Sequence, residues 1–196
     1  MTSWKAFYER TEARAPSPLL SCAMDHVRDL QPRHAIDLGC GSGNEAWQLI
    51  QGGWQVLAID KEPEAIVRTI RKCSMAEARR LTAEVADFEH LAHLPPSALI
   101  YAGLALPFCG PNRFPNLWCQ IRNALVLGGV FVGHFFGLRH SWASAEQISF
   151  HCVEDIRRLS EGFEIVLLRE SESSMVIDSG AVNWHRINVI VRKPHQ

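Results

Sequence analysis

The residues best suited to chemistry begin with a glycine-rich segment that runs Ile36-Asp37-Leu38-Gly39-Cys40-Gly41-Ser42-Gly43. Glycines at alternate positions allow a tight turn and let a backbone approach a ligand closely. A dinucleotide-binding fingerprint would need a glycine at position 44, which is Asn44, and a P-loop would need a Gly-Lys-Ser/Thr run. Since neither pyrophosphate motif is present, the segment predicts an adenosyl ligand without a phosphate.

Two acidic residues at predicted strand ends fit the same ligand. Asp60 follows an apolar run, and a carboxylate there can accept hydrogen bonds from both ribose hydroxyls. The alternative is a solvated strand end, or a cap for a helix at Pro63. Asp87 is followed by Phe88, so a carboxylate could accept from the adenine amino group while the aromatic ring packs on the base. The alternative for Asp87 is an ordinary turn residue.

The series Asp-Leu-Gly-Cys-Gly-Ser-Gly, Ala-Ile-Asp60 and Ala-Asp87-Phe88 resembles the motifs of class I S-adenosylmethionine-dependent methyltransferases. The resemblance covers roughly residues 35–193. Within that superfamily, Phe7-Tyr8-Glu9 and Trp184-His185 resemble the small tellurite-resistance and thiopurine-type group.

The resemblance implies a cofactor, S-adenosyl-L-methionine, with S-adenosyl-L-homocysteine as product, and a set of residues around it. By position, Gly39 and Gly41 would approach the methionine part and the ribose, and Asp60 would bind the ribose diol. Asp37 would order the loop near the cofactor's amino group, and Leu104 would line the reaction centre. The cofactor-binding residues expected in this way are Asp37, Gly39, Gly41, Asp60, Lys61, Asp87, Phe88 and Leu104.

Methyl transfer from a sulfonium is an in-line displacement that mainly requires alignment and exclusion of water. A general base is needed only when the acceptor arrives protonated. His134, near the end of a predicted strand, is the candidate base, although such a histidine is often a hydrogen-bonded core residue. Tyr8, with Trp4, lies on an N-terminal segment that by resemblance folds over the cofactor. The alternative is a loose surface helix.

Further candidates for contact with substrate or cofactor are few. Arg139, His140 and Trp142 fall in a loop after a predicted strand, where substrate loops occur, although a solvated loop fits equally. Arg10 and Arg14 are candidates to pair with the cofactor carboxylate. His185 is expected to be structural.

The elements that must position these residues alternate between strands and helices. Apolar runs predict strands at 34–38, 54–59, 84–88, 98–106, 129–136, 163–169 and 187–191. Helical spacing predicts helices at 18–30, 44–51, 63–80, 114–125 and 153–160. This order predicts an α/β, Rossmann-like doubly wound sheet with helices on both faces. The resemblance implies seven mostly parallel strands with the last antiparallel, and the last two strands are expected to form a hairpin joined by 170–184.

The simplest organisation is one methyltransferase domain over residues 1–196, in which an N-terminal helical segment, 1–33, covers the cofactor site.

The chain has 20 Lys and Arg against 21 Asp and Glu, so no basic excess points to nucleic acid. The six cysteines lack metal-site spacing and predict free thiols in a reducing cytoplasm, with no metal. The longest apolar stretch, 126–138, is too short to span a bilayer.

Residues 100–108 give the only indication of the acceptor. They lack the Asn/Asp-Pro-Pro-aromatic motif of DNA amino methylases, and their apolar rim of Leu104, Leu106 and Phe108 indicates a small, partly apolar or soft nucleophile. The sequence therefore predicts a methyltransferase for a small-molecule acceptor. Alternatives are a nicotinamide-dependent reductase, a non-catalytic adenosyl- or partner-binding module, or, less favoured, an aminopropyl transferase. The oligomeric state stays open.

Overall fold

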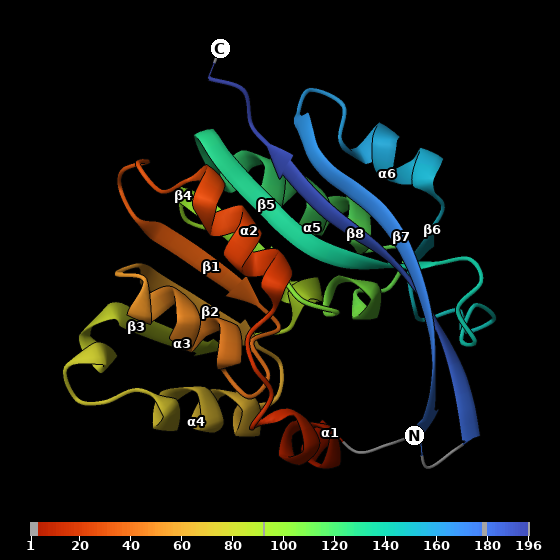
Figure 1. Ribbon diagram of the computed structural model, residues 1–196, viewed down its shortest axis with the longest axis horizontal. Coiled ribbons are helices and arrows are strands. Elements are labelled where there is room, and N and C mark those ends of the chain that lie inside the picture. Colours follow the sequence, from red (N-terminus) through yellow and green to blue (C-terminus); the bar gives the residue numbers. More distant parts are fainter. Residues whose placement is uncertain (1–3, 92, 178–179, 196) are drawn as a thin grey trace.

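A computed structural model describes residues 4–91, 93–177 and 180–195. Its centre is one sheet in the order β3-β2-β1-β4-β5-β8-β7, with a two-residue β6 beside β5 (Figure 1). The first five strands are parallel, β8 runs antiparallel to β5, and β7 is antiparallel to β8. The predicted doubly wound α/β fold with an antiparallel last strand is confirmed, and β6 makes the strand count eight rather than seven.

The strands are β1 (His34–Leu38), β2 (Gln55–Asp60), β3 (Leu81–Val85), β4 (Ser97–Ala102), β5 (Leu125–Gly137), β6 (Phe150–His151), β7 (Glu164–Ile177) and β8 (Gly180–Arg192). The α-helices are α1 (Trp4–Thr11), α2 (Pro18–His26), α3 (Asn44–Gln51), α4 (Pro63–Lys72), α5 (Phe114–Ala124) and α6 (Val153–Leu159). Three 3-10 turns complete the set: η1 (Glu77–Arg80), η2 (Phe88–His90) and η3 (Leu106–Phe108).

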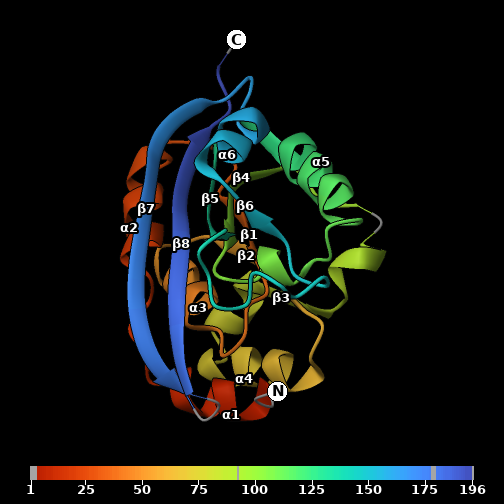
Figure 2. The ribbon, with the colours of Figure 1, turned by 90° about the vertical axis from the view of Figure 1, so that its right-hand side faces the viewer.

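Helices cover both faces of the sheet, with α2 and α3 on one side and α5 and α6 on the other (Figure 2). Each face has its own apolar core. Leu20, Leu49 and Trp54 belong to the cluster on the α2–α3 side, and Phe131 and Ile121 belong to the cluster on the α5 side. Both faces of the central strands are therefore buried, which is why those strands are apolar throughout.

Local sequence signals set several boundaries. Pro63 begins α4, where a missing N–H costs nothing. Gly53, with φ +84°, follows the C-cap residue Gly52 of α3 and adopts the left-handed conformation that suits glycine. The third strand is Leu81–Val85, so the prediction of 84–88 was wrong. The chain leaves the strand there because Asp87 accepts a hydrogen bond from the Glu89 N–H and begins η2.

The longest departure from the prediction is the hairpin of β7 and β8. The segment 170–184 was expected to join two short strands, but pairing continues from Glu164↔Arg192 to Ile177↔Gly180. Only the first part of this ribbon lies beside β5, whose last pair is Phe136↔Arg186. The remainder extends past the carboxyl edge of the parallel strands, toward α1 (Figures 1 and 2). Backbone pairing holds this exposed, polar segment in strands.

Across 4–91, 93–177 and 180–195, no helix combines the length and apolarity needed to cross a membrane. Over the same ranges, no cluster of three or more His, Cys, Asp or Glu side chains could hold a metal ion. The first three residues of the expected N-terminal segment 1–33 lie outside the described residues.

Candidate active site

The glycine loop lies between β1 and α3, at the carboxyl edge where the strand order reverses between β1 and β4. Gly39, Gly41 and Gly43 all have positive φ, at +73°, +53° and +76°. A Cβ on Gly39 would lie 2.3 Å from the Ala105 Cβ, and one on Gly43 would lie 2.7 Å from the Thr69 Cα. These two glycines therefore allow close packing of the loop. A Cβ on Gly41 would meet only the Tyr8 ring, at 3.6 Å.

Asp60, the last residue of β2, reaches the glycine loop directly. Its Oδ2 accepts a hydrogen bond from the Gly41 N–H at 2.9 Å, and its Oδ1 accepts one from the Glu62 N–H at 3.0 Å. The Tyr8 hydroxyl donates to the same Oδ1 at 3.5 Å. Burial raises the pKa of Asp60, and the two backbone donors oppose that shift. The structure thus brings Tyr8, Gly41 and Asp60 together.

Asp37 is 1% exposed, and neither of its carboxylate oxygens has a hydrogen-bond partner among the described residues. Burial, then the charges of Glu45 and Asp60, raise its pKa well above the usual range, although the Ala46 N–H, which misses full hydrogen-bond geometry, opposes that shift. A buried carboxylate without a partner is costly unless a ligand satisfies it. An ammonium group is the natural partner, so Asp37 fits the amino end expected for the cofactor.

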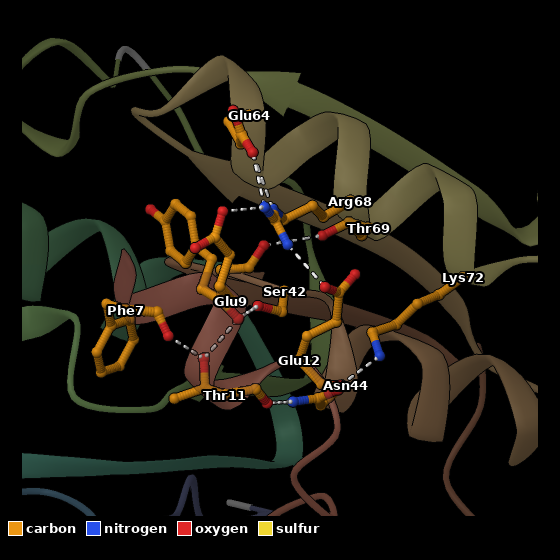
Figure 3. Close-up of polar contacts among 12 residues, drawn as sticks. Phe7, Glu9, Thr11, Glu12, Ser42, Asn44, Glu64, Arg68, Thr69 and Lys72 are labelled. Carbon is orange, nitrogen blue, oxygen red and sulfur yellow. Dashed lines mark hydrogen bonds and ion pairs between the residues drawn. The ribbon is translucent and has the colours of Figure 1, made fainter. Parts of the chain in front are cut away.

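Helix α1 is tied to the loop and to α4 by several polar contacts (Figure 3). The Ser42 hydroxyl donates to the Tyr8 carbonyl at 3.1 Å, and the Asn44 side chain donates to the Thr11 carbonyl at 2.9 Å. From α4, Arg68 contacts Glu12 at 2.7 Å and Glu9 at 3.8 Å. Arg68 also pairs with Glu64 at 2.7 Å, and Lys72 donates to the Glu12 carbonyl at 2.9 Å. The N-terminal helix is therefore packed on the glycine loop.

The arginines considered for the cofactor carboxylate lie differently. Arg14 pairs with the buried Glu45 at 2.8 Å, and the same Glu45 oxygen accepts from the Ser17 N–H at 3.0 Å. Arg10 is exposed and its guanidinium lies over the Phe7 ring. Glu45 was missed by sequence reasoning, although an acid in the first turn of a helix after a glycine loop is a usable signal.

The other residues predicted to bind the cofactor surround the loop less closely. Phe88 is half-buried, 3.6 Å from the Cβ position of Gly39, whereas Asp87 is exposed and accepts from the Glu89 N–H at 2.9 Å. Lys61 is exposed, with its Nζ 5.6 Å from the centre of the Trp4 ring. Leu104 has φ +56°, the only non-glycine with positive φ among the described residues. Such strain in a leucine is common at functional sites.

His134, the candidate base, lies in β5 opposite Asn188 of β8. Its Nδ1 is buried and has no hydrogen-bond partner among the described residues. Burial, then the charges of Arg186 and Arg14, lower its pKa to about 4, so the imidazole is neutral at pH 7. Tyr8, the other catalytic candidate, stays a neutral phenol because burial and the Asp60 charge raise its pKa.

In the loop after β5, Arg139 is paired with the β7–β8 ribbon and His140 is packed against an aromatic ring. Arg139 pairs with Glu172 at 2.6 Å and with Glu170 at 3.3 Å, both on β7. Its backbone N–H donates to Nδ1 of the buried His185, whose Nε2 lies 2.9 Å from Glu170. Arg139 and His185 thus join the loop to the ribbon. His140 is buried and stacks on Phe136 with ring centres 4.2 Å apart.

A set of rings runs along the carboxyl edge from α1 to β8, here called the aromatic row: Trp4, Phe108, Phe136, His140, Trp142 and Trp184. The Trp4 ring lies 5.1 Å from Phe108, and Phe108 lies 5.8 Å from Phe136. Trp142 lies 6.1 Å from Phe136 and 5.4 Å from Trp184. Sequence reasoning used Trp184 only for the family resemblance and placed neither Phe136 nor Trp184 in the site, because nothing in the chain signals that the ribbon returns to this edge.

Comparison with known proteins agrees with this arrangement. Residues 35–129 match the family model described as "Methyltransferase domain". Trans-aconitate 2-methyltransferase of Delftia acidovorans is 34% identical over 101 residues, which cover 50% of this chain and 37% of that protein. A second such enzyme, from Acidovorax ebreus, is 29% identical over 66% of this chain and 48% of its own length. The chain spans less than half the length of these relatives.

Solved structures share the whole fold. TehB from Haemophilus influenzae has a TM-score of 0.76 at 15% identity, covering 95% of this chain and 65% of that one. A 1,6-didemethyltoxoflavin-N1-methyltransferase from Burkholderia thailandensis, bound to its substrate and S-adenosylhomocysteine, has a TM-score of 0.68 at 16% identity, covering 96% and 81%. Residues 35–129 thus resemble a methyltransferase domain, and the whole chain shares the fold of solved methyltransferases, one of them bound to S-adenosylhomocysteine.

Proposed function

We propose that this chain transfers a methyl group from S-adenosyl-L-methionine to a small-molecule acceptor. The observation that carries the proposal is the contact of the Asp60 carboxylate with the Gly41 N–H at 2.9 Å, at the carboxyl edge of β1 and β2. It joins a loop that leaves room for a ligand backbone to a carboxylate suited to a ribose diol. The unsatisfied Asp37 beside this pair supports the same ligand.

The roles of the residues follow from their chemistry. Asp37 would neutralise the cofactor's amino group, Gly39 and Gly41 would lie along its methionine part and ribose, and Asp60 would accept from the ribose hydroxyls. Lys61, Asp87 and Phe88 are assigned to the rim of the adenosine site. Asp87 Oδ1 accepts from the Glu89 N–H, which leaves its second carboxylate oxygen as the acceptor for an adenine amino group.

When bound, the cofactor supplies an electrophilic methyl group on a sulfonium with a good leaving group. The chain then has to align the acceptor in line and keep water away. Leu104 and the aromatic row, which lie along the carboxyl edge, are suited to both tasks. His134 is the candidate base; because it is neutral at pH 7, its imidazole is free to accept a proton, although its lowered pKa makes it a weak base.

We also propose residues 1–196 as one domain in which the segment 1–33 covers the cofactor. The contacts of α1 with Gly41, Ser42 and Asp60 support this cover.

A small-molecule acceptor agrees with the acceptors in the names of the relatives, trans-aconitate and 1,6-didemethyltoxoflavin. Six free cysteines support a reducing cytoplasm as the place of action.

The test is isothermal titration of the purified chain with S-adenosylmethionine, S-adenosylhomocysteine, NADH and NADPH. Micromolar binding of the first two alone supports the proposal, and an acceptor screen that follows release of S-adenosylhomocysteine then tests turnover. Binding of a nicotinamide cofactor in their place would contradict the proposal and support a reductase. Cofactor binding without turnover on any acceptor would favour a non-catalytic module.

A further inference from the structure

Two buried hydrogen-bond donors in the aromatic row have no partner among the described residues. His140 is 3% exposed, and its Nδ1 accepts from the Trp142 N–H at 3.1 Å. A neutral imidazole that accepts at Nδ1 carries its proton on Nε2, and this atom is unsatisfied. The indole Nε1–H of Trp184 is unsatisfied too. The two rings are 5.1 Å apart at their centres.

Unsatisfied N–H groups are costly when they are buried, and two of them on neighbouring rings leave two donors for a ligand's acceptor atoms. Burial lowers the pKa of His140 to about 4, so the ring is neutral at pH 7 and the pair offers two neutral donors. Neutral donors suit a carbonyl, a phenol oxygen or a ring nitrogen. They are less suited to several carboxylates, which call for cations.

The cations at this edge are largely committed elsewhere. Arg139 pairs with Glu170 and Glu172, and Arg14 pairs with Glu45. Lys61 lies over the Trp4 ring. Arg186 lowers the pKa of both His134 and His140 by its charge, so it acts on the histidine side of the row. With Lys61 and Arg186 as cations beside it, the row fits a single polar or ionisable oxygen better than a tricarboxylate.

The surroundings are aromatic, with Phe108, Phe136 and Trp142 in mutual ring contact and Trp4 against Phe108. Such rings stack on planar ligands with gains beyond buried area. Trp142 is half-buried on the loop after β5, which hydrogen bonds such as Ser141 N–H to the Asn183 carbonyl tie to β8. Its ring centre lies 5.0 Å from that of His140 and 5.4 Å from that of Trp184, so it forms a wall beside the two donors.

We propose that the aromatic row binds the methyl acceptor, and that this acceptor is a planar aromatic compound with a hydroxyl, oxo or ring-nitrogen group held by His140 Nε2 and Trp184 Nε1. This inference rests on the proposed function, because it names the acceptor class of the same site. It separates this chain from relatives named for trans-aconitate, an acyclic tricarboxylate.

The experiment titrates 7-hydroxycoumarin, 4-hydroxyquinoline and trans-aconitate into the chain by calorimetry, with and without saturating S-adenosylhomocysteine. The variants are Trp184→Phe, which keeps a ring but loses the N–H, and Trp142→Ala, which removes the wall. The matched control is Trp47→Phe, since Trp47 is 39% exposed on α3, outside the aromatic row. Circular dichroism and S-adenosylhomocysteine affinity report whether each variant keeps its fold and cofactor site.

The proposal expects saturable binding of at least one of the two aromatic probes. Trp184→Phe weakens it about fivefold or more and Trp142→Ala about tenfold or more, while Trp47→Phe changes it less than twofold. Binding of neither aromatic probe, equal affinities in all variants, or preference for trans-aconitate would overturn the proposal. Binding that only Trp142→Ala weakens would overturn the role of the two donors. Failure of S-adenosylhomocysteine to bind would instead contradict the proposed function, while the titrations without it still test the row.

Discussion

The hydroxyl oxygen of Tyr8 lies 3.5 Å from Oδ1 of Asp60, while the Tyr8 ring lies against Gly41. One side chain of α1 thus touches both parts of the candidate cofactor site. Gly41 and Glu62 already donate to the same carboxylate. A ribose diol would therefore compete with the Tyr8 hydroxyl, which makes the position of α1 sensitive to the cofactor.

Two glycines of the loop should respond differently to the same substitution. Gly39→Ala adds a Cβ that would lie 2.3 Å from the Ala105 Cβ, whereas Gly41→Ala meets only the Tyr8 ring at 3.6 Å. Both substitutions should lower the free energy of unfolding by about 1–2 kcal/mol because alanine disfavours a positive φ. Gly39→Ala should lower it further because the new Cβ clashes with Ala105. Urea unfolding should therefore show a larger loss for Gly39→Ala. Equal losses would mean that Ala105 does not constrain the loop.

Asp37→Asn should stabilise the unliganded protein at pH 7 and weaken cofactor binding. The folded-state pKa of Asp37 lies well above the unfolded one, so the protein loses unfolding free energy as the pH rises from the unfolded pKa toward the folded pKa. That cost disappears as the pH falls toward the ordinary aspartate range. Thermal melts should thus show a higher Tm for the variant at pH 7 and a smaller difference at pH 4. A lower Tm at pH 7 would contradict an unsatisfied Asp37.

His134 should make the protein sensitive to mild acid. Its folded pKa is about 4, below the 6.5 of a free histidine, so its contribution is complete above pH 6.5 and is lost as the pH falls toward 4. Between pH 7 and 5, wild-type protein should lose about 1–2 kcal/mol more unfolding free energy than His134→Gln. Urea midpoints at the two pH values measure this. The exposed His90→Gln is the control, and it should behave as wild type.

Arg68→Met should loosen α1 from the body of the protein. The Arg68 side chain is only 13% exposed and contacts Glu9, Glu12 and Glu64 at once (Figure 3). Losing such a network should lower the free energy of unfolding and speed tryptic cleavage after Arg10 or Arg14. The comparison is Arg28→Met, whose pair with Asp25 is exposed on both sides and should matter little. Identical cleavage rates would show that Arg68 does not hold the helix.

The sequence allowed the fold to be predicted where local signals are strong. The strand 34–38 and the helix 44–51 have the predicted bounds, because an apolar run, three glycines and a Gly52–Gly53 stop fix them. The ribbon of β7 and β8 was not predicted in full, since exposed residues such as Glu172 and Ser173 carry no strand pattern and are paired only through the backbone.

The candidate site divides in the same way. Asp60 and the glycine loop follow a linear motif, so their neighbourhood could be predicted. The aromatic row could not, because Trp4, Phe108 and Trp184 come from distant parts of the chain and meet only through the fold. Likewise, the pairing of Arg139 with the ribbon depends on strands that the sequence did not indicate.

The most direct test of the account is the affinity of S-adenosylhomocysteine for wild-type protein and for Asp60→Asn, measured by isothermal titration, with the exposed Asp25→Asn as control. The account predicts micromolar binding to wild type and to the control, and a loss of about 1.5–3 kcal/mol in a folded Asp60→Asn, from weaker charge-assisted hydrogen bonds. Unchanged affinity in Asp60→Asn, or no binding to wild type, would contradict it.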